Sequence, residues 1–408
     1  MSESPRFQSA RPPGFVIWAA QILNRLDLAW RNRLHLEPRD LQVLRDLSPG
    51  MGTIVVSNHA DEVDMRACIE LSRRCGRRFL YMMNSEAFDE GSGSAGWWLR
   101  RLGAFSVERG GRNEQAKRYA IDAVKRGQEV LVVFPEGEIY YLNDLVQPFK
   151  SGVVDIGMQA VVESRRALPD WTAYLVPMAI KYRYRRPIEP ILERRIRLME
   201  QHLFRRIHGD SLSRRLGLIM AELLHRQEMI HHLEPDPNRI AELNERVQQV
   251  RQQVLSRAEE QYTSPAADSR SRTMDRTWRL SSYLRGLLRQ GWQFSAERRA
   301  RFRIDLAGLK RVAQMAGWQP HYVDLDPSQE RLAETVLKLE REVYGTARPR
   351  QLAKRDVFLR IGEPIDLARF AAPYLQNAQA IRHGVAEQLR DVIQGLIDAI
   401  PTARTKAR

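Results

Sequence analysis

The chain has 408 residues, more than one ordinary hydrophobic core accommodates, so its length predicts two structural units. Hydrophobic residues make up 43% of the sequence, a share that excludes wholesale disorder. The formal net charge of +15 predicts a basic surface, which attracts nucleic acid, anionic lipid headgroups or acidic carrier proteins. An arginine-rich soluble protein without such partners has the same composition, so charge alone does not choose among them.

The cysteine content and the absence of long apolar runs indicate the compartment. Cys68 and Cys75 share one face of a predicted helix but lie too far apart along it to bond. We therefore expect buried thiols in a reducing compartment and no metal site. The first 13 residues do not resemble a signal peptide, and no uncharged run approaches the roughly 18–20 residues of a spanning helix. These features predict a cytoplasmic protein, either soluble or peripheral on the inner membrane.

Residues 1–34 form a first region, in which apolar side chains follow a roughly helical spacing from residue 14 onward. Trp18 and Trp30 have arginines nearby, which suits an amphipathic helix lying in a membrane interface. A helix packed on the protein's own core would show the same spacing. The sequence leaves both interpretations open.

Residues 35–184 alternate short apolar runs with helical patterns, which predicts a mostly parallel sheet flanked by helices. We expect strands at 53–56, 77–83, 104–107, 129–134 and 173–180. We expect helices at 65–71, 97–102, 113–125 and 153–163, with a loop at 91–94.

From residue 185 the pattern becomes almost entirely helical, and it returns to a strand only at 356–362. We therefore predict an α/β core in two parts, 35–184 and 355–400, interrupted by a long helical insertion at 185–354. Within the insertion we expect helices at 278–291, 295–316 and 330–344, and breaks at 235–237 and 263–269. A helix at 377–400 closes the core, and a disordered basic tail is expected at 401–408.

Polar side chains follow three of the predicted core strands. His59 and Asp64 follow the first strand, Arg109 follows the third, and Glu136 and Gly137 follow the fourth. Because the carboxyl ends of parallel strands face one crevice, we expect these residues to line a single pocket. A histidine can take a proton from a hydroxyl while a carboxylate orients it, although the His59 and Asp64 spacing alone is also typical of helix capping.

These blocks, taken in order, resemble those of the glycerolipid acyltransferases of the lysophosphatidic-acid acyltransferase type. The matching segments are 59–64 (His-x4-Asp), 103–109, 134–137 (Phe-Pro-Glu-Gly) and 176–180, with further matches at 149–152 and 361–365. The resemblance covers residues 35–184 and 355–400 and implies an acyltransferase-type sheet. It implies 1-acylglycerol-3-phosphate O-acyltransferase-like chemistry in phospholipid biosynthesis. A fatty acyl group would move from acyl-CoA or acyl-carrier protein to a hydroxyl of a lysophospholipid, a glycerolipid or a related acceptor.

The same resemblance implies roles for individual residues. His59 would be the general base and Asp64 its partner, with no metal or cofactor required. Arg109 would bind the acceptor's phosphate. The residues that would shape the acceptor site or add positive charge there are Glu136, Gly137 and Lys150.

The chain departs from the family pattern at two places. Glu138-Ile139-Tyr140 stands where the family has Thr-Arg-Ser, which weakens anion binding and favours an acceptor whose phosphate is absent, smaller or replaced by a cationic group. Compact members also lack the insertion at 185–354. An alternative is therefore a degenerate acyltransferase core that acts as a membrane- or partner-binding protein. Nucleic-acid binding is not expected, because the basic residues are spread through helices.

Overall fold

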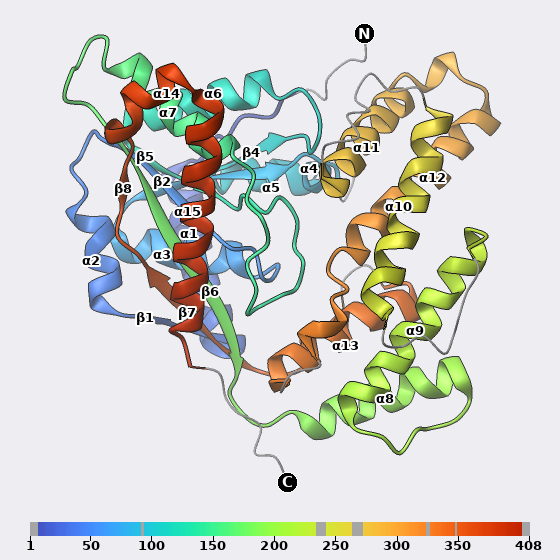
Figure 1. The fold of residues 1–408 in the computed structure, drawn as a ribbon. Coiled ribbons are helices and arrows are strands. Elements are labelled where there is room, and N and C mark those ends of the chain that lie inside the picture. The colour runs from blue at the N-terminus through green and yellow to red at the C-terminus, as the bar shows by residue number, and fades with distance from the viewer. Residues whose placement is uncertain are drawn as a thin grey trace.

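The computed structural model describes residues 7–90, 94–233, 242–262, 272–323, 327–346 and 349–401 (Figure 1). The expected loop residues 91–93, the breaks at 235–237 and 263–269 and the tail at 402–408 lie outside the described residues. The predicted fold class is confirmed. A mostly parallel sheet is flanked by helices, and the chain segment between its last two long strands forms a helical lobe, at the right in Figure 1.

The described residues form an eight-stranded sheet in the order β1-β7-β6-β2-β5-β3-β4, with β8 paired to β6. The strands are β1 (Asn32–Leu36), β2 (Gly52–Ser57), β3 (Arg78–Asn84), β4 (Ala104–Val107), β5 (Glu129–Val133), β6 (Ala173–Tyr184), β7 (Arg355–Ile361) and β8 (Ile365–Asp366). The strands from β6 to β4 are parallel, whereas β7 runs antiparallel to β6. The carboxyl ends of β2, β5 and β4 therefore lie at one edge of the sheet, as expected.

Helices cover both faces of the sheet because the central strands are apolar on both sides. In β2, Ile54 and Val56 pack toward α6 (Glu114–Arg126), α7 (Gly152–Ser164) and α15 (Ala378–Asp398). The intervening Val55 packs toward α2 (Pro38–Asp46) and α3 (Asp64–Cys75) on the opposite face. Shorter helices complete this part of the fold: α4 (Glu86–Asp89), α5 (Ser94–Arg101) and α14 (Ala371–Gln376).

The N-terminal helix α1 (Gly14–Arg31) is shorter than the sequence pattern indicated. The chain changes to strand β1 at Asn32, and neither β1 nor α2 was expected. Strand β1 could not be predicted from nearby residues, because it forms by pairing in parallel with the distant strand β7, with Asn32 opposite Arg355. Helix α1 contacts α3 and β1, so it packs on the core along one side.

The described residues between β6 and β7 form helices joined by loops, with no strand among them. The segment contains α8 (Glu189–Phe204), α9 (Leu212–Ile230), α10 (Leu243–Gln261), α11 (Thr273–Arg289), α12 (Ala296–Met315) and α13 (Gln329–Tyr344). These helices bury apolar side chains in two further clusters, one of which also includes Tyr140, Leu142 and Tyr184 from the sheet part of the fold. Buried ion pairs join neighbouring helices, with Arg215 bonded to Glu200 and Arg246 bonded to Glu228. The insertion is therefore a packed lobe with its own hydrophobic core.

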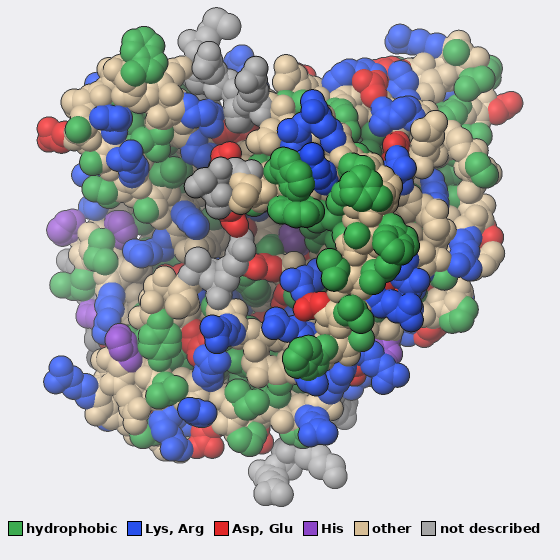
Figure 2. Space-filling model, turned by 180° about the vertical axis from the view of Figure 1, so that it is seen from behind, with side chains coloured by type: hydrophobic (Ala, Val, Ile, Leu, Met, Phe, Trp, Pro, Cys, Tyr) green, Lys and Arg blue, Asp and Glu red, His purple; other side chains and the backbone are tan. Residues whose placement is uncertain are grey.

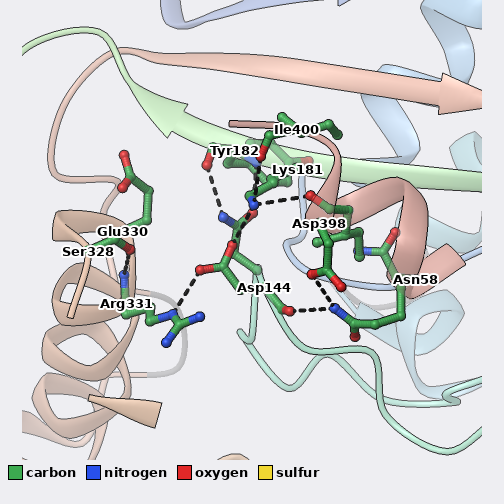
Figure 3. Close-up of polar contacts among 12 residues, drawn as sticks. Asn58, Asp144, Lys181, Tyr182, Ser328, Glu330, Arg331, Asp398 and Ile400 are labelled. Carbon is green, nitrogen blue, oxygen red and sulfur yellow. Dashed lines mark hydrogen bonds and ion pairs between the residues drawn. The ribbon is translucent and has the colours of Figure 1, made fainter. Parts of the chain in front are cut away.

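A buried polar network fastens this lobe to the sheet (Figure 3). Asp144, in the loop after β5, lies 3.0 Å from Nζ of Lys181 in β6 and accepts a 2.9 Å hydrogen bond from Nε of Arg331 in α13. Glu330 of α13 accepts a 2.9 Å hydrogen bond from the backbone N–H of Tyr184. Because a buried charge is costly without partners, these contacts fix α13 and the loop after β5 against β6.

Candidate active site

The turn between β2 and α3 is held against the sheet by a buried asparagine. The side chain of Asn58 donates to the carbonyl of Ile180 over 2.9 Å and accepts from its backbone N–H over 2.8 Å. This pair of bonds fastens the turn to β6 and places the next residue, His59, at the carboxyl end of β2. The turn is therefore a fixed platform for the histidine.

His59 and Asp64 form a closely paired dyad. Nδ1 of His59 lies 2.7 Å from Oδ2 of Asp64, whose side chain is fully buried. The same carboxylate accepts hydrogen bonds from the hydroxyl of Tyr182 at 2.6 Å and from the backbone N–H of Asp61 at 3.0 Å. Oδ1 of Asp61 in turn accepts a 3.0 Å hydrogen bond from the backbone N–H of Val63, so the turn before α3 contains capping contacts as well as the dyad. Since a carboxylate only accepts, Nδ1 is the donor in this pair, and the neutral form of the imidazole then has its lone pair on Nε2.

The Phe-Pro-Glu-Gly block supports the dyad from the end of β5. The ring of Phe134 stacks on that of His59, with ring centroids 4.3 Å apart and planes inclined by 20°. Oε1 of Glu136 accepts a 3.1 Å hydrogen bond from the backbone N–H of His59. Burial raises the pKa of Glu136 well above its usual range. Gly137 has a left-handed φ of 74°, and its missing side chain leaves room for Lys150, whose Cε would lie 3.1 Å from a Cβ at this position.

The two cations expected at the acceptor site both have partners from the protein. Nη1 of Arg109 lies 2.7 Å from Oε2 of Glu138, the first residue of the departure from the family pattern. Nζ of Lys150 lies 3.5 Å from the ring centroid of Trp278 and 3.9 Å from Oδ1 of Asp275, both in α11. Burial lowers the pKa of Lys150 to about 8. The positive charge of this region is therefore partly compensated by the chain itself.

Helix α11 of the insertion forms a wall beside this region. The loop after β4 approaches it so closely that a Cβ on Gly110 would lie 2.2 Å from the backbone carbon of Trp278. Arg285 of α11 contacts Glu86 at 2.5 Å and Glu108 at 3.4 Å, one residue before Arg109. The insertion thus contacts two of the segments that carry the predicted site residues.

The structure brings together every residue that the sequence nominated. His59, Asp64 and Glu136 are joined by direct hydrogen bonds, Gly137 contacts Lys150, and Arg109 joins the same block through Glu138. Sequence reasoning missed the residues that hold the dyad and its turn in place. These are Tyr182, which bonds Asp64, and Arg355, whose Nη1 donates to Oδ2 of Asp61 over 2.7 Å and whose guanidinium lies over the ring of Tyr182.

Other expectations concerned cysteines, metals and membrane spans. Cys68 and Cys75 are free and buried, and burial raises the pKa of both thiols. Among the described residues, no group of three or more His, Cys, Asp or Glu side chains is arranged to hold a metal ion. Within the same ranges, every helix is too short or too polar to cross a membrane.

A parallel sheet that carries a His-x4-Asp dyad at the end of one strand and a Phe-Pro-Glu-Gly block at the end of its neighbour defines an acyltransferase-type domain. Residues 39–181 match the family described as Acyltransferase. A 1-acyl-sn-glycerol-3-phosphate acyltransferase from Streptococcus pneumoniae (strain ATCC BAA-255 / R6) is 31% identical over 105 residues. This part of the chain is therefore similar to the glycerolipid acyltransferases.

The similarity to that relative is partial. The aligned residues are 26% of this chain and 35% of the relative, so the chain spans about a third of the length of the curated protein that it matches. No solved structure matches the chain.

Proposed function

We propose that the protein is an O-acyltransferase that moves a fatty acyl group from a thioester, acyl-CoA or acyl-carrier protein, to a hydroxyl. The acceptor is a lysophospholipid, a glycerolipid or a related alcohol. The observation that carries this proposal is the 2.7 Å contact between Nδ1 of His59 and the buried carboxylate of Asp64, at the end of a parallel strand. An assembled dyad supports an enzyme rather than a degenerate binding core.

The proposed reaction uses the dyad as a general base. Nε2 of His59 takes the proton of the acceptor hydroxyl while its oxygen attacks the carbonyl carbon of the thioester. Asp64 stabilises the imidazolium that forms. When the tetrahedral intermediate collapses, the carbon–sulfur bond breaks, the thiolate leaves, and the proton returns from His59 to sulfur. A thioester is already activated, so this route needs no nucleophile from the enzyme.

For the acceptor, we propose a headgroup that does not present a phosphate to Arg109. A phosphate bound to Arg109 would lie beside the carboxylate of Glu138, which contacts the guanidinium at 2.7 Å. Like charges at such short range cost free energy, more so where water is partly excluded. An uncharged or cationic headgroup avoids this cost.

We further propose that the protein works at the inner membrane surface, where lipid acceptors are found. The support is a band of exposed hydrophobic side chains on the face seen in Figure 2, with Lys and Arg side chains beside it. Helix α1 exposes Phe15, Trp18, Leu23, Leu26 and Trp30, and α5 adds Trp97 and Trp98. Aromatic and aliphatic side chains flanked by cations are typical of interfacial helices.

The test is to incubate the purified protein with labelled acyl-CoA or acyl-carrier protein and a lipid extract, and to identify the labelled product by mass spectrometry. We expect one acylated lipid to form with the native protein and none with His59→Ala, whose fold is checked by circular dichroism. Full turnover by a folded His59→Ala protein would refute the proposed mechanism. Absence of any product with both donors and a broad range of alcohols would favour the binding-protein alternative.

A further inference from the structure

A cavity of about 880 Å³ lies beside the turn that carries the dyad. One wall is Asp61, Glu62 and Val63, the residues between His59 and Asp64 that lie next to α3. The other walls come from Tyr141, from α13, from the segment 349–355 and from the end of α1. Two of these walls, α13 and residues 349–354, belong to the insertion that compact family members lack.

The lining of this cavity is strongly basic. Among the described residues, seven cationic side chains line it, namely Arg31, Arg66, Lys338, Arg341, Arg350, Lys354 and Arg355, against the carboxylates of Asp61 and Glu62. Some of these cations already have partners: Arg355 bonds Asp61, Arg66 bonds Asp27, and Lys338 donates to the carbonyl of Gly317. The lining still holds more cations than carboxylates, which favours an anionic occupant.

Two exposed cations are placed to receive that occupant. Arg350 and Lys354 are exposed at the cavity. Arg341 also lines the cavity, but its Nε is buried and lies 3.6 Å from the carboxylate of Glu342. The exposed pair can bind phosphate oxygens by charge-assisted hydrogen bonds.

The size and position of the cavity indicate which anion it takes. A volume of about 880 Å³ is in the range of small-molecule sites and suits a nucleotide, whereas a carrier protein would dock on an open surface. The hydroxyl of Tyr141 donates a 3.1 Å hydrogen bond to Glu62, so the cavity wall is continuous with the turn that positions His59. A thioester on a flexible arm that starts in this cavity would therefore lie close to the general base.

We infer that this cavity binds the phosphate-bearing nucleotide end of an acyl-CoA donor, and that the helical insertion supplies much of the donor site. The inference rests on the proposed function, because only an acyltransferase would use this ligand as its acyl donor. Binding of the ligand can still be measured without turnover. It selects acyl-CoA over acyl-carrier protein as the donor. It also gives the insertion a role that the compact fold does not need.

The experiment uses free coenzyme A as the probe and the full chain as the protein, with isothermal titration calorimetry. The test variant is Arg350→Gln with Lys354→Gln, and the matched control is Arg194→Gln with Lys310→Gln, which removes an exposed arginine and an exposed lysine elsewhere on the insertion. We expect the test variant to weaken binding by about tenfold or more and the control to leave it unchanged. Added salt should weaken binding to the native protein more than to the test variant.

Turnover assays separate this inference from the proposed function. In the test variant the KM for acyl-CoA should rise, while kcat and the KM for the acceptor stay the same. Coenzyme A binding that depends on Arg350 and Lys354, without any acyl transfer, would keep the inference and refute the function. Transfer that requires His59 but shows an unchanged KM for acyl-CoA would keep the function and overturn the inference.

Two further results would overturn the inference. One is equal weakening in the control pair, which would mean that the effect comes from general charge. The other is displacement of coenzyme A by glycerol 3-phosphate at similar concentration, which would assign the cavity to the phosphate of an acceptor.

Discussion

The hydroxyl of Tyr182 donates a 2.6 Å hydrogen bond to Oδ1 of Asp64, the carboxylate whose other oxygen faces Nδ1 of His59. Burial raises the pKa of Tyr182 well above its usual range, so this hydroxyl keeps its proton and remains a donor at neutral pH. Tyr182 lies in β6, and its position is fixed by backbone bonds to the side chain of Asn143. It therefore orients Asp64 without touching the proposed substrate.

Replacing Tyr182 by phenylalanine should slow the reaction without changing substrate binding. A hydrogen bond to a charged group contributes roughly 1.5–3 kcal/mol, so we expect kcat to fall about 10-fold or more while both KM values stay nearly constant. Steady-state kinetics with thermal melting as a check on folding would measure this. Tyr184→Phe is the matched control, because it removes a buried hydroxyl from the same strand with no side-chain partner on the dyad. An equal loss in both variants would contradict the positioning role.

Breaking the Arg109 and Glu138 pair should change which acceptors the protein uses. Glu138→Gln removes the negative charge and releases the guanidinium, so we expect the KM for a phosphate-bearing acceptor such as lysophosphatidic acid to fall several-fold. The KM for a phosphate-free acceptor such as a monoacylglycerol should not change. Glu163→Gln, which breaks a comparable pair with Arg118 on α6, is the control and should affect neither acceptor. If the native protein already prefers the phosphate-bearing acceptor, the proposed headgroup class is wrong.

Lys150 should make the stability of the protein depend on pH in the basic range. Its pKa is about 8 in the folded protein and 10.5 in its ordinary state, so between these values the unfolded chain binds a proton that the folded protein does not. The free energy of unfolding should therefore rise from pH 8 to pH 10 in the native protein relative to Lys150→Met. Urea unfolding at several pH values measures this difference.

The control for Lys150 is an exposed lysine on the insertion. Lys310→Met removes an exposed lysine without touching the proposed site, and the two variants are compared over the same pH range. A difference for Lys150→Met that stays flat or falls with pH would mean that the folded protein does not disfavour the charged lysine.

The sequence predicted the parts of the fold that have a local signal. The central strands and His59, Asp64 and Glu136 lie where apolar runs and the motif spacing placed them. Strand β1 was missed because Asn32–Leu36 is short and half polar, and it becomes a strand only by pairing with β7, more than 300 residues later.

The contacts of the site residues were harder to predict from the sequence than the site residues themselves. Tyr182 lies beyond the predicted end of its strand at residue 180, although the alternation of aromatic and basic residues at 181–184 was a signal that the strand continued. The sequence showed that Glu138 departs from the family pattern. Its ion pair with Arg109, however, depends on how two loops pack against each other. The contact between Lys150 and Trp278 depends on how the insertion folds back over the sheet, for which a single sequence carries no local pattern.

Helix α1 should attach the protein to anionic membranes through its exposed side chains. Trp18 and Trp30 are 65% and 68% exposed although α1 packs on α3, so the helix has a free apolar side as well as a buried one. Trp18→Ala with Trp30→Ala should reduce co-sedimentation with phosphatidylglycerol-containing vesicles several-fold, because each buried indole contributes apolar area to the interface. Transfer to a water-soluble short-chain acceptor at saturating donor should be unaffected, since neither tryptophan lies at the dyad and only Trp30 adjoins the proposed donor site, through Lys354. Trp292→Ala is the control, because this residue is 85% exposed on the insertion. If Trp292→Ala releases the protein from vesicles and the α1 variant does not, the insertion rather than α1 is the membrane-binding element.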